Sequence, residues 1–390
     1  MPNPNLICEV RANGGVFRDW LTIEASQSVD KSWMRTFSLT CAEPDSPGSK
    51  RKTASGQSWA SAAKSVSDVL VPGTRVDITL AGQPFITQGL IGQRQAAYDA
   101  NRHAVRVTGF SKSEITNLAS ADAGTGQFRG YKLDAIANRL LKPYGLKFRV
   151  ESGPPGWDTP FPNVVIRHGE TAFSAISRLC RQRGMWFWSD PNGDLVAGIG
   201  QQEAAGIVFE EGVNILSANC SLDWQGAETA ILDAQQWGSD HLSGRQAAEI
   251  SAQSKFGGGN PMPGTFRQVL AEMPLSQQEL QLRTKMEVMA MQTALMRVKL
   301  AYQGWLNPAG ALWDMADMVT VKSPMLFPVQ DAKLDLKLFG VTHTQTPDGQ
   351  TTSAIDLVNL AAFQQRYPDA TKSDGFFNVP SSDPKPSPAA

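Results

Sequence analysis

Residues 161–200 read FPNVVIRHGETAFSAISRLCRQRGMWFWSDPNGDLVAGIG and place a strand, a helix and a hairpin in one continuous stretch. The apolar run at 164–166 predicts a short strand. Gly169 then opens a segment whose apolar residues recur at helical spacing: Phe173, Ile176, Leu179 and Cys180. Gly184 can adopt the left-handed conformation that ends a helix. The turn residues Pro191-Asn192-Gly193 follow between two apolar runs, which predicts a β-hairpin.

The same plan occurs once earlier in the chain, at residues 130–148. Gly130 and Gly145 bracket a helical segment at the spacing that Gly169 and Gly184 show. Two helix-strand units therefore predict a small α/β domain. The similarity indicates either a structural repeat or a chance likeness between two amphipathic helices.

Composition bounds the class of protein. The chain has 390 residues, 41% hydrophobic and 19% charged, which is typical of a globular protein with two to four domains. A net charge of -1 gives no broad basic surface for nucleic acid. The sequence has neither a secretion signal nor a long apolar run. It therefore predicts neither export through a secretion signal nor a membrane span. The four cysteines lack C-x-x-C spacing, so we expect small buried residues made in a reducing cytosol: Cys8, Cys41, Cys180 and Cys220.

Alternating apolar and polar residues on both sides of the central stretch predict antiparallel strands, with one long hairpin in each region. The expected fold class is α+β, mainly β, with two antiparallel β-barrel-like domains flanking a small α/β domain. The predicted division is a first β-barrel domain at 1–112 with an exposed loop at 43–68, the α/β domain at 113–200, a second β-barrel domain at 201–363 and a Pro-rich tail at 364–390.

A helix is predicted inside the second β domain, at 276–297. Ser276 and Glu279 form a capping box at its start. Its apolar stripe consists of Leu282, Met286, Met289, Thr293 and Met296. Such a stripe either packs on the protein's own sheet, which we favour, or presents a Met-rich face that adapts to a partner.

Two segments are candidates for contact with a partner. Lys50, Arg51 and Lys52 form a basic cluster in the exposed loop, which is either solvated or a contact for phosphate or membrane. Phe376 and Phe377 are the only strong apolar anchor of the tail, whose composition predicts disorder unless a partner holds it.

Residue patterns that carry chemistry are missing from the sequence. The histidines are scattered without metal-ligand spacing: His103, His168, His241 and His343. No nucleophile elbow or phosphate-binding loop occurs, and the adjacent acids Glu210 and Glu211 point to opposite faces of a strand. We therefore predict no catalytic, cofactor-binding or metal-binding residue and no enzymatic activity.

Taken in order, the motifs resemble the baseplate hub protein family of Mu-like contractile phages, also called tail protein P. The resemblance extends to about residue 363. It is carried by the 169–184 helix, the 189–193 turn, the stretch Glu211-Gly212-Val213-Asn214-Ile215, and the segment 304–313 with a tryptophan near each end.

The resemblance implies a structural protein without cofactors in the virion tail baseplate, assembled in the bacterial host cytoplasm. It implies a homotrimeric ring in which two barrel domains per subunit alternate, so that a six-fold tail tube can meet a three-fold spike. Its partners would be other copies of itself, the tail tube and spike proteins, and other baseplate proteins, with no nucleic acid.

Two other functions remain open at this point. A tail-associated cell-wall hydrolase would degrade peptidoglycan. A carbohydrate-binding β-protein would stack sugars on Trp305 and Trp313, provided that these side chains are exposed.

Overall fold

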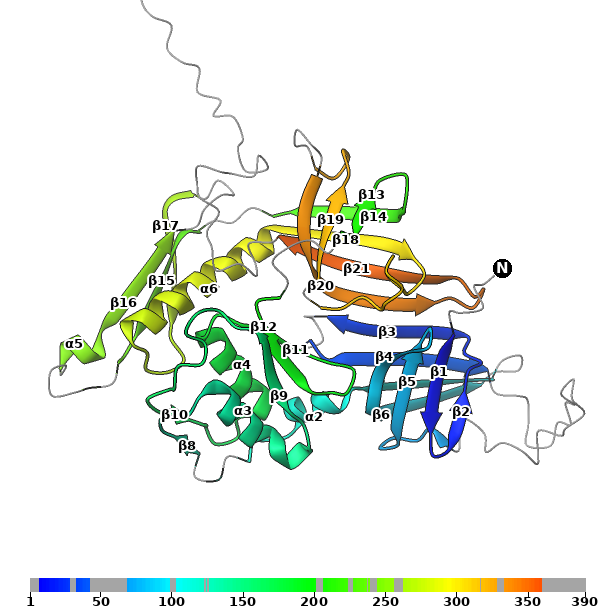
Figure 1. Cartoon of the computed structure of the whole chain (residues 1–390), viewed down its shortest axis with the longest axis horizontal. Coiled ribbons are helices and arrows are strands. Elements are labelled where there is room, and N and C mark those ends of the chain that lie inside the picture. Colours follow the sequence, from blue (N-terminus) through cyan, green and yellow to red (C-terminus); the bar gives the residue numbers. More distant parts are fainter. Residues whose placement is uncertain are drawn as a thin grey trace, which may run out of the picture.

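The computed structural model describes residues 7–28, 33–42, 69–98, 103–122, 124, 126–200, 206–223, 227–236, 238, 244–255, 262–315, 317–327 and 333–359. Within them, a large β-sheet runs along one side of the molecule, with an α/β region and a small helix-covered sheet beside it (Figure 1). The fold is mainly β, as predicted.

The first half of the large sheet comes from the N-terminal residues. Its strands are β1 (Cys8–Ala12), β2 (Gly15–Phe17), β3 (Thr22–Ser28), β4 (Arg35–Ala42), β5 (Arg75–Leu80), β6 (Gln83–Tyr98) and β7 (His103–Phe110). All of their mutual pairings are antiparallel, in the order β3-β4-β7-β6-β5-β1-β2. The predicted long hairpin is β6–β7.

The second half comes from the C-terminal residues. Its strands are β13 (Val208–Glu210), β14 (Ile215–Leu222), β18 (Met296–Gln303), β19 (Met318–Lys322), β20 (Lys333–Gln345) and β21 (Thr351–Asn359). The main order is β14-β18-β21-β20, with β19 on β20 and β13 parallel to β19. The second predicted hairpin is β20–β21.

The two β regions are not separate barrels. Strand β20 pairs with β3, so a single 13-stranded sheet crosses from one half to the other. No ring of paired strands closes within the described residues, and the predicted barrel closure is therefore not seen. Alternation in sequence identifies the two faces of a strand, but it leaves open which edges pair.

Two tryptophans interlock the halves. Trp33, next to β4, packs in the core of the C-terminal half, with its ring 4.7 Å from that of Phe339 and edge-on to it. Trp305, just after β18, is fully buried in the core of the N-terminal half. Its indole nitrogen donates to the Thr344 carbonyl at 3.0 Å. Each half therefore completes the core of the other.

The α/β region contains the predicted central elements. They are η2 (Lys112–Glu114), α2 (Ile115–Leu118), β8 (Gln127–Phe128), α3 (Leu133–Leu141), η3 (Lys142–Tyr144), β9 (Phe148–Ser152), β10 (Val164–Val165), α4 (Ala172–Gln182), β11 (Trp186–Ser189) and β12 (Leu195–Gly198). The hairpin is confirmed, because Trp186 pairs antiparallel with Gly198. Gly145 and Gly184 both have left-handed φ, at 62° and 70°.

Polar contacts fix this region to the large sheet. The Gln27 amide donates to the Ser189 carbonyl at 2.8 Å, and the buried Arg35 reaches the same oxygen at 3.3 Å. On the back of β20, Lys337 donates to the Ile199 carbonyl at 2.7 Å. The end of the hairpin thus docks on β3, β4 and β20.

The residues between β14 and β18 form the third part of the fold, beside the large sheet and the α/β region. It consists of β15 (Ala227–Ala234), α5 (Arg245–Ala248), β16 (Ile250–Lys255), β17 (Met262–Leu270) and α6 (Gln277–Leu295). The capping box is confirmed, because the Ser276 hydroxyl accepts from the Glu279 amide and the Glu279 carboxylate accepts from the Ser276 amide. Helix α6 lies across the sheet β16-β15-β17 (Figure 1).

The predicted apolar stripe of α6 is only partly correct. Met286 is buried, but Leu282 is only half-buried and Met296 belongs to β18. The side chains of Met289 and Thr293 lie outside the described residues. The residues that meet the small sheet are Leu280, Val288 and Met291. Helix α6 therefore packs on the protein's own sheet, as favoured, with a different set of side chains.

Candidate assembly interface

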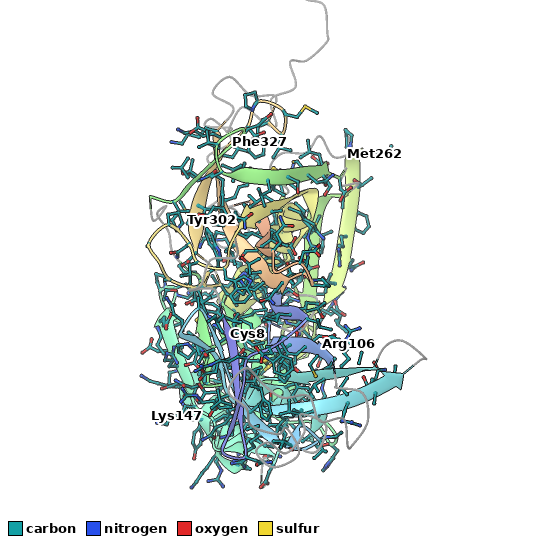
Figure 2. The ribbon with its side chains drawn as sticks, turned by 90° about the vertical axis from the view of Figure 1, so that its right-hand side faces the viewer. Cys8, Arg106, Lys147, Met262, Tyr302 and Phe327 are labelled. Carbon is teal, nitrogen blue, oxygen red and sulfur yellow. The ribbon has the colours of Figure 1, made fainter. Side chains whose placement is uncertain are left out.

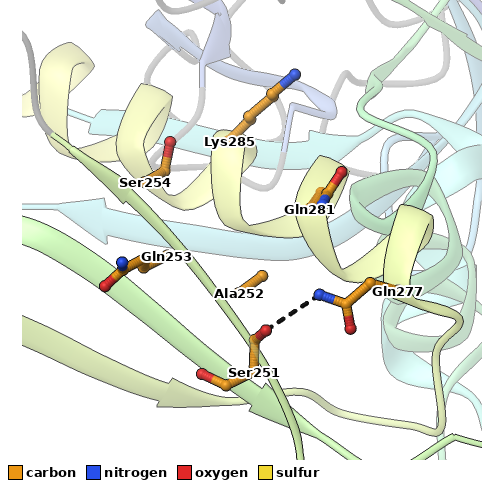
Figure 3. A pocket seen from close by; sticks show the side chains of 7 residues that line it. All are labelled: Ser251, Ala252, Gln253, Ser254, Gln277, Gln281 and Lys285. Carbon is orange, nitrogen blue, oxygen red and sulfur yellow. Dashed lines mark hydrogen bonds between the residues drawn. The ribbon is translucent and has the colours of Figure 1, made fainter.

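The polar hollow between β16 and α6 offers little for catalysis. The hollow between β16 and α6 has a volume of 310 Å³ and is lined by Ser251, Ala252, Gln253, Ser254, Gln277, Gln281 and Lys285 (Figure 3). The Gln277 amide donates to the Ser251 carbonyl at 3.1 Å across its edge. Neither a carboxylate nor an imidazole lines this hollow, so it has no acid–base pair.

Candidate metal ligands are equally sparse. Among the described residues, no group of three or more His, Cys, Asp or Glu side chains is placed to hold a metal ion. His343 is fully buried, and its Nδ1 lies 3.0 Å from the Ser353 hydroxyl. Burial lowers the pKa of His343 to about 3, so the imidazole is neutral and structural. No described helix is long and apolar enough to span a membrane.

Sugar stacking on the two tryptophans is excluded because both side chains are buried. Trp305 is 0% exposed and Trp313 is 2% exposed. The Trp313 ring instead stacks on Phe209 with centroids 5.4 Å apart. Glu210 pairs with Lys322, and Glu211 accepts from the Ser323 hydroxyl. Neither tryptophan face is therefore available for a glycan.

The predicted contact residues lie outside the described part of the structure. Lys50, Arg51 and Lys52 fall in the gap at 43–68, and Phe376 and Phe377 fall beyond residue 359. The structure brings none of them to a site, and they stay predictions.

One end of the large sheet is open. β14 pairs with β18 only, and no described strand lies on its outer side. Ala218, Cys220 and Leu222 stand opposite buried residues of β18, so they belong to the core side of the sheet. Leu222 is nevertheless 52% exposed. The apolar side of β14 therefore extends past the core of this chain.

The second open edge is on β6. Strand β5 pairs with the first part of β6, up to Leu90, and β7 pairs with its second part, from Leu90 to Tyr98. Beyond the bulge at Gly92, no described strand lies on the side opposite β7. This part of the β6–β7 hairpin projects from the body, near the labelled Arg106 (Figure 2). Residues 95–97 are exposed.

These edges bound two similar four-strand units. The main path of the sheet reads β14-β18-β21-β20 followed by β3-β4-β7-β6. In each unit the last strand forms a hairpin with the strand beside it, and an extra strand, β19 or β5, pairs with the first part of that last strand. Sequence reasoning detected the paired hairpins but not the open edges. The signal was present in β14, whose residues ILSANCSL include no charge, glycine or proline.

Comparisons with known proteins place this architecture. Residues 119–199 match the family described as the second domain of gp44-like baseplate hub proteins. Over 331 residues the chain is 24% identical to baseplate hub protein gp44 of Escherichia phage Mu, an alignment that covers 80% of this chain and 78% of that protein.

Two solved structures share the fold. The 43 kDa tail protein of prophage MuSo2 from Shewanella oneidensis has a TM-score of 0.72 at 21% identity, covering 91% of this chain and 99% of that one. The tail protein from Neisseria meningitidis MC58 has a TM-score of 0.70 at 16% identity, covering 95% and 97%.

The fold is therefore that of phage tail proteins. Residues 119–199 match the second domain of gp44-like baseplate hub proteins, and over most of its length the chain is similar to the Mu hub protein. This confirms the resemblance seen in the sequence. The matched family and the Mu relative are baseplate hub proteins, which are structural components of the phage tail.

Proposed function

We propose that three copies of this hub protein form a closed ring that joins a six-fold tail tube to a three-fold spike. The observation that supports it is the repeated four-strand unit, which occurs twice in one chain. Three copies would carry six such units. A ring of this kind can present near six-fold symmetry on one face while keeping three-fold symmetry overall.

The two open edges suit such a ring. A contact between unlike surfaces of identical subunits closes into a ring when the rotation fits. The β14 edge and the β6 edge are unlike, and they lie at the two ends of the paired units. In this ring the two units would form the predicted barrel-like domains at 1–112 and 201–363. The α/β domain at 113–200 and the tail at 364–390 would complete each subunit.

Partners other than the chain itself belong to the proposal too. The tail tube protein and the spike protein would bind the two faces of the ring, and other baseplate proteins would bind its rim. Lys50, Arg51, Lys52, Phe376 and Phe377 are the proposed contacts with such proteins. Assembly would take place in the bacterial host cytoplasm.

The mass of the purified full chain in solution tests the trimer. We expect light scattering after size exclusion to give three times the mass of one chain. Averaged electron micrographs of the particle should show six similar lobes. A chain that stays monomeric at every concentration tested would refute the proposal.

A further inference from the structure

We infer that the outer edge of β14 pairs, antiparallel, with the part of β6 beyond Gly92 in a second copy, and that Cys220 stands opposite Ala96 of that copy. The inference rests on the proposed ring and specifies the strand pairing between neighbouring subunits, which we call the joint. It depends on a contact that each chain already makes within itself.

The internal contact is the pairing of β20 with β3. β20 is the last strand of the C-terminal unit and β3 is the first strand of the N-terminal unit. They pair antiparallel from Gly340–Ser28 to Gln345–Ile23, with His343 opposite Ala25. In a ring of six similar units, the last strand of the N-terminal unit, β6, needs the same neighbour. Among the described strands, the first strand that has no such neighbour is β14, so β14 of another copy can supply it.

A shared irregularity aligns β6 with β20. Each strand has a β-bulge against its hairpin partner, directly before Gln93 in β6 and directly before Gly340 in β20. In each strand, the part before the bulge pairs with the extra strand, β5 or β19. Counting on from the bulge, Ala96 corresponds to His343.

The first strands align through the same bulges. Across β18, Cys220 is aligned with Leu357 of β21. Leu357 in turn pairs with the residue just before the bulge of β20. In the same way, Ala25 is aligned across β4 with Gly109 of β7. Gly109 in turn pairs with the residue just before the bulge of β6. Cys220 therefore corresponds to Ala25. Since His343 pairs with Ala25, Ala96 is predicted to pair with Cys220 of the neighbouring copy.

The chemistry of both edges agrees with this partner. Soluble proteins protect exposed edge strands with charge, proline or bulges to prevent edge-to-edge association. The eight residues of β14 have none of the first two, and its single bulge lies at its start, between Ile215 and Ser217. The core-side row of β14, Ala218 with Cys220 and Leu222, would be covered by the incoming strand. A second copy is the partner that brings a matching edge.

Oxidative cross-linking of the full chain tests the register. In the variant Ala96→Cys, the new thiol would stand opposite the native Cys220 of the next copy, with Cβ atoms about 4.5–5.5 Å apart. Two copper(II)–phenanthroline complexes would each accept one electron, the two thiols would release their two protons to the buffer, and the two sulfur atoms would form one disulfide. Mildly alkaline conditions suit the reaction, because burial raises the pKa of Cys220. Cys8, Cys41 and Cys180 are buried and should not compete.

Two controls isolate the pair. Ala97→Cys puts the thiol on the opposite face of β6, because successive strand side chains alternate. Ala96→Cys combined with Cys220→Ser removes the partner thiol. Neither control should form the disulfide, whereas Ala97→Cys combined with Asn219→Cys should form a second one.

We expect non-reducing gels of Ala96→Cys to show dimers and trimers and nothing larger, and the wild type and both controls to stay single. If the wild type is trimeric by light scattering but Ala96→Cys cross-links no better than Ala97→Cys, this joint is wrong and the ring stands. If the wild type is monomeric, the proposed function itself fails. A ladder beyond three chains would refute closure at three.

Discussion

Replacing Lys337 by Met should change how the stability of the protein depends on pH. The Lys337 side chain is fully buried between the back of β20 and the end of β12. Burial lowers the pKa of its ammonium group to about 7, from an ordinary value of 10.5. The folded chain therefore releases this proton near neutral pH, while the unfolded chain keeps it until well above pH 9.

The sign follows from proton binding. Between pH 7 and pH 10.5 the unfolded state binds more protons at Lys337 than the folded state, so the free energy of unfolding rises with pH. Each unit of pKa shift corresponds to about 1.4 kcal/mol, so from pH 7 to pH 9 this side chain should add about 2–3 kcal/mol. Below pH 7 the folded state carries the full cost of a buried charge. The Lys337→Met variant has no titrating group at this position, so its free energy of unfolding lacks the rise between pH 7 and pH 9.

Urea denaturation of both proteins at pH 7, 8 and 9, at one protein concentration, measures the effect. The difference between wild type and Lys337→Met removes the titration of all other groups. It should shift in favour of the wild type by about 2–3 kcal/mol across that range. Lys333→Met, at the exposed start of β20, is the control and should give no slope. Parallel pH profiles for wild type and Lys337→Met would refute the reasoning.

Three further changes test the core, the joint and a buried ion pair. Trp305→Phe removes the hydrogen bond to Thr344 and leaves a cavity, so urea unfolding should show a loss of about 2–4 kcal/mol. One transition for both halves is expected, and two separate transitions would contradict the interlocked core. Leu222→Lys puts a charge into the proposed joint and should yield monomers by light scattering, whereas Leu270→Lys, at an exposed position of β17, should remain trimeric. Glu170→Gln leaves the buried Arg178 without its carboxylate and should cost about 3–5 kcal/mol, against less than about 1 kcal/mol for Asp158→Asn in the exposed pair with Lys132. Equal losses for the two pairs would show that burial does not set the cost.

Local sequence signals determined the elements of the α/β region. The hairpin at 186–198 follows from the residues of its turn, and Gly184 ends α4 because glycine tolerates left-handed φ. The capping box at Ser276 likewise predicted where α6 begins. These signals act within a few residues, so they can be read without knowledge of the rest of the chain.

The tertiary structure decided how the β regions combine. Nothing local to β20 specifies that its second part pairs with β3, some 320 residues earlier in the chain. The exchange of Trp33 and Trp305 between the two cores is equally non-local. The buried face of α6 was misread because its apolar and polar residues are mixed, and only the small sheet beneath it selects Leu280, Val288 and Met291. Backbone conformation is encoded by neighbours in sequence, whereas the pairing of edges depends on surfaces that exist only once the strands have come together.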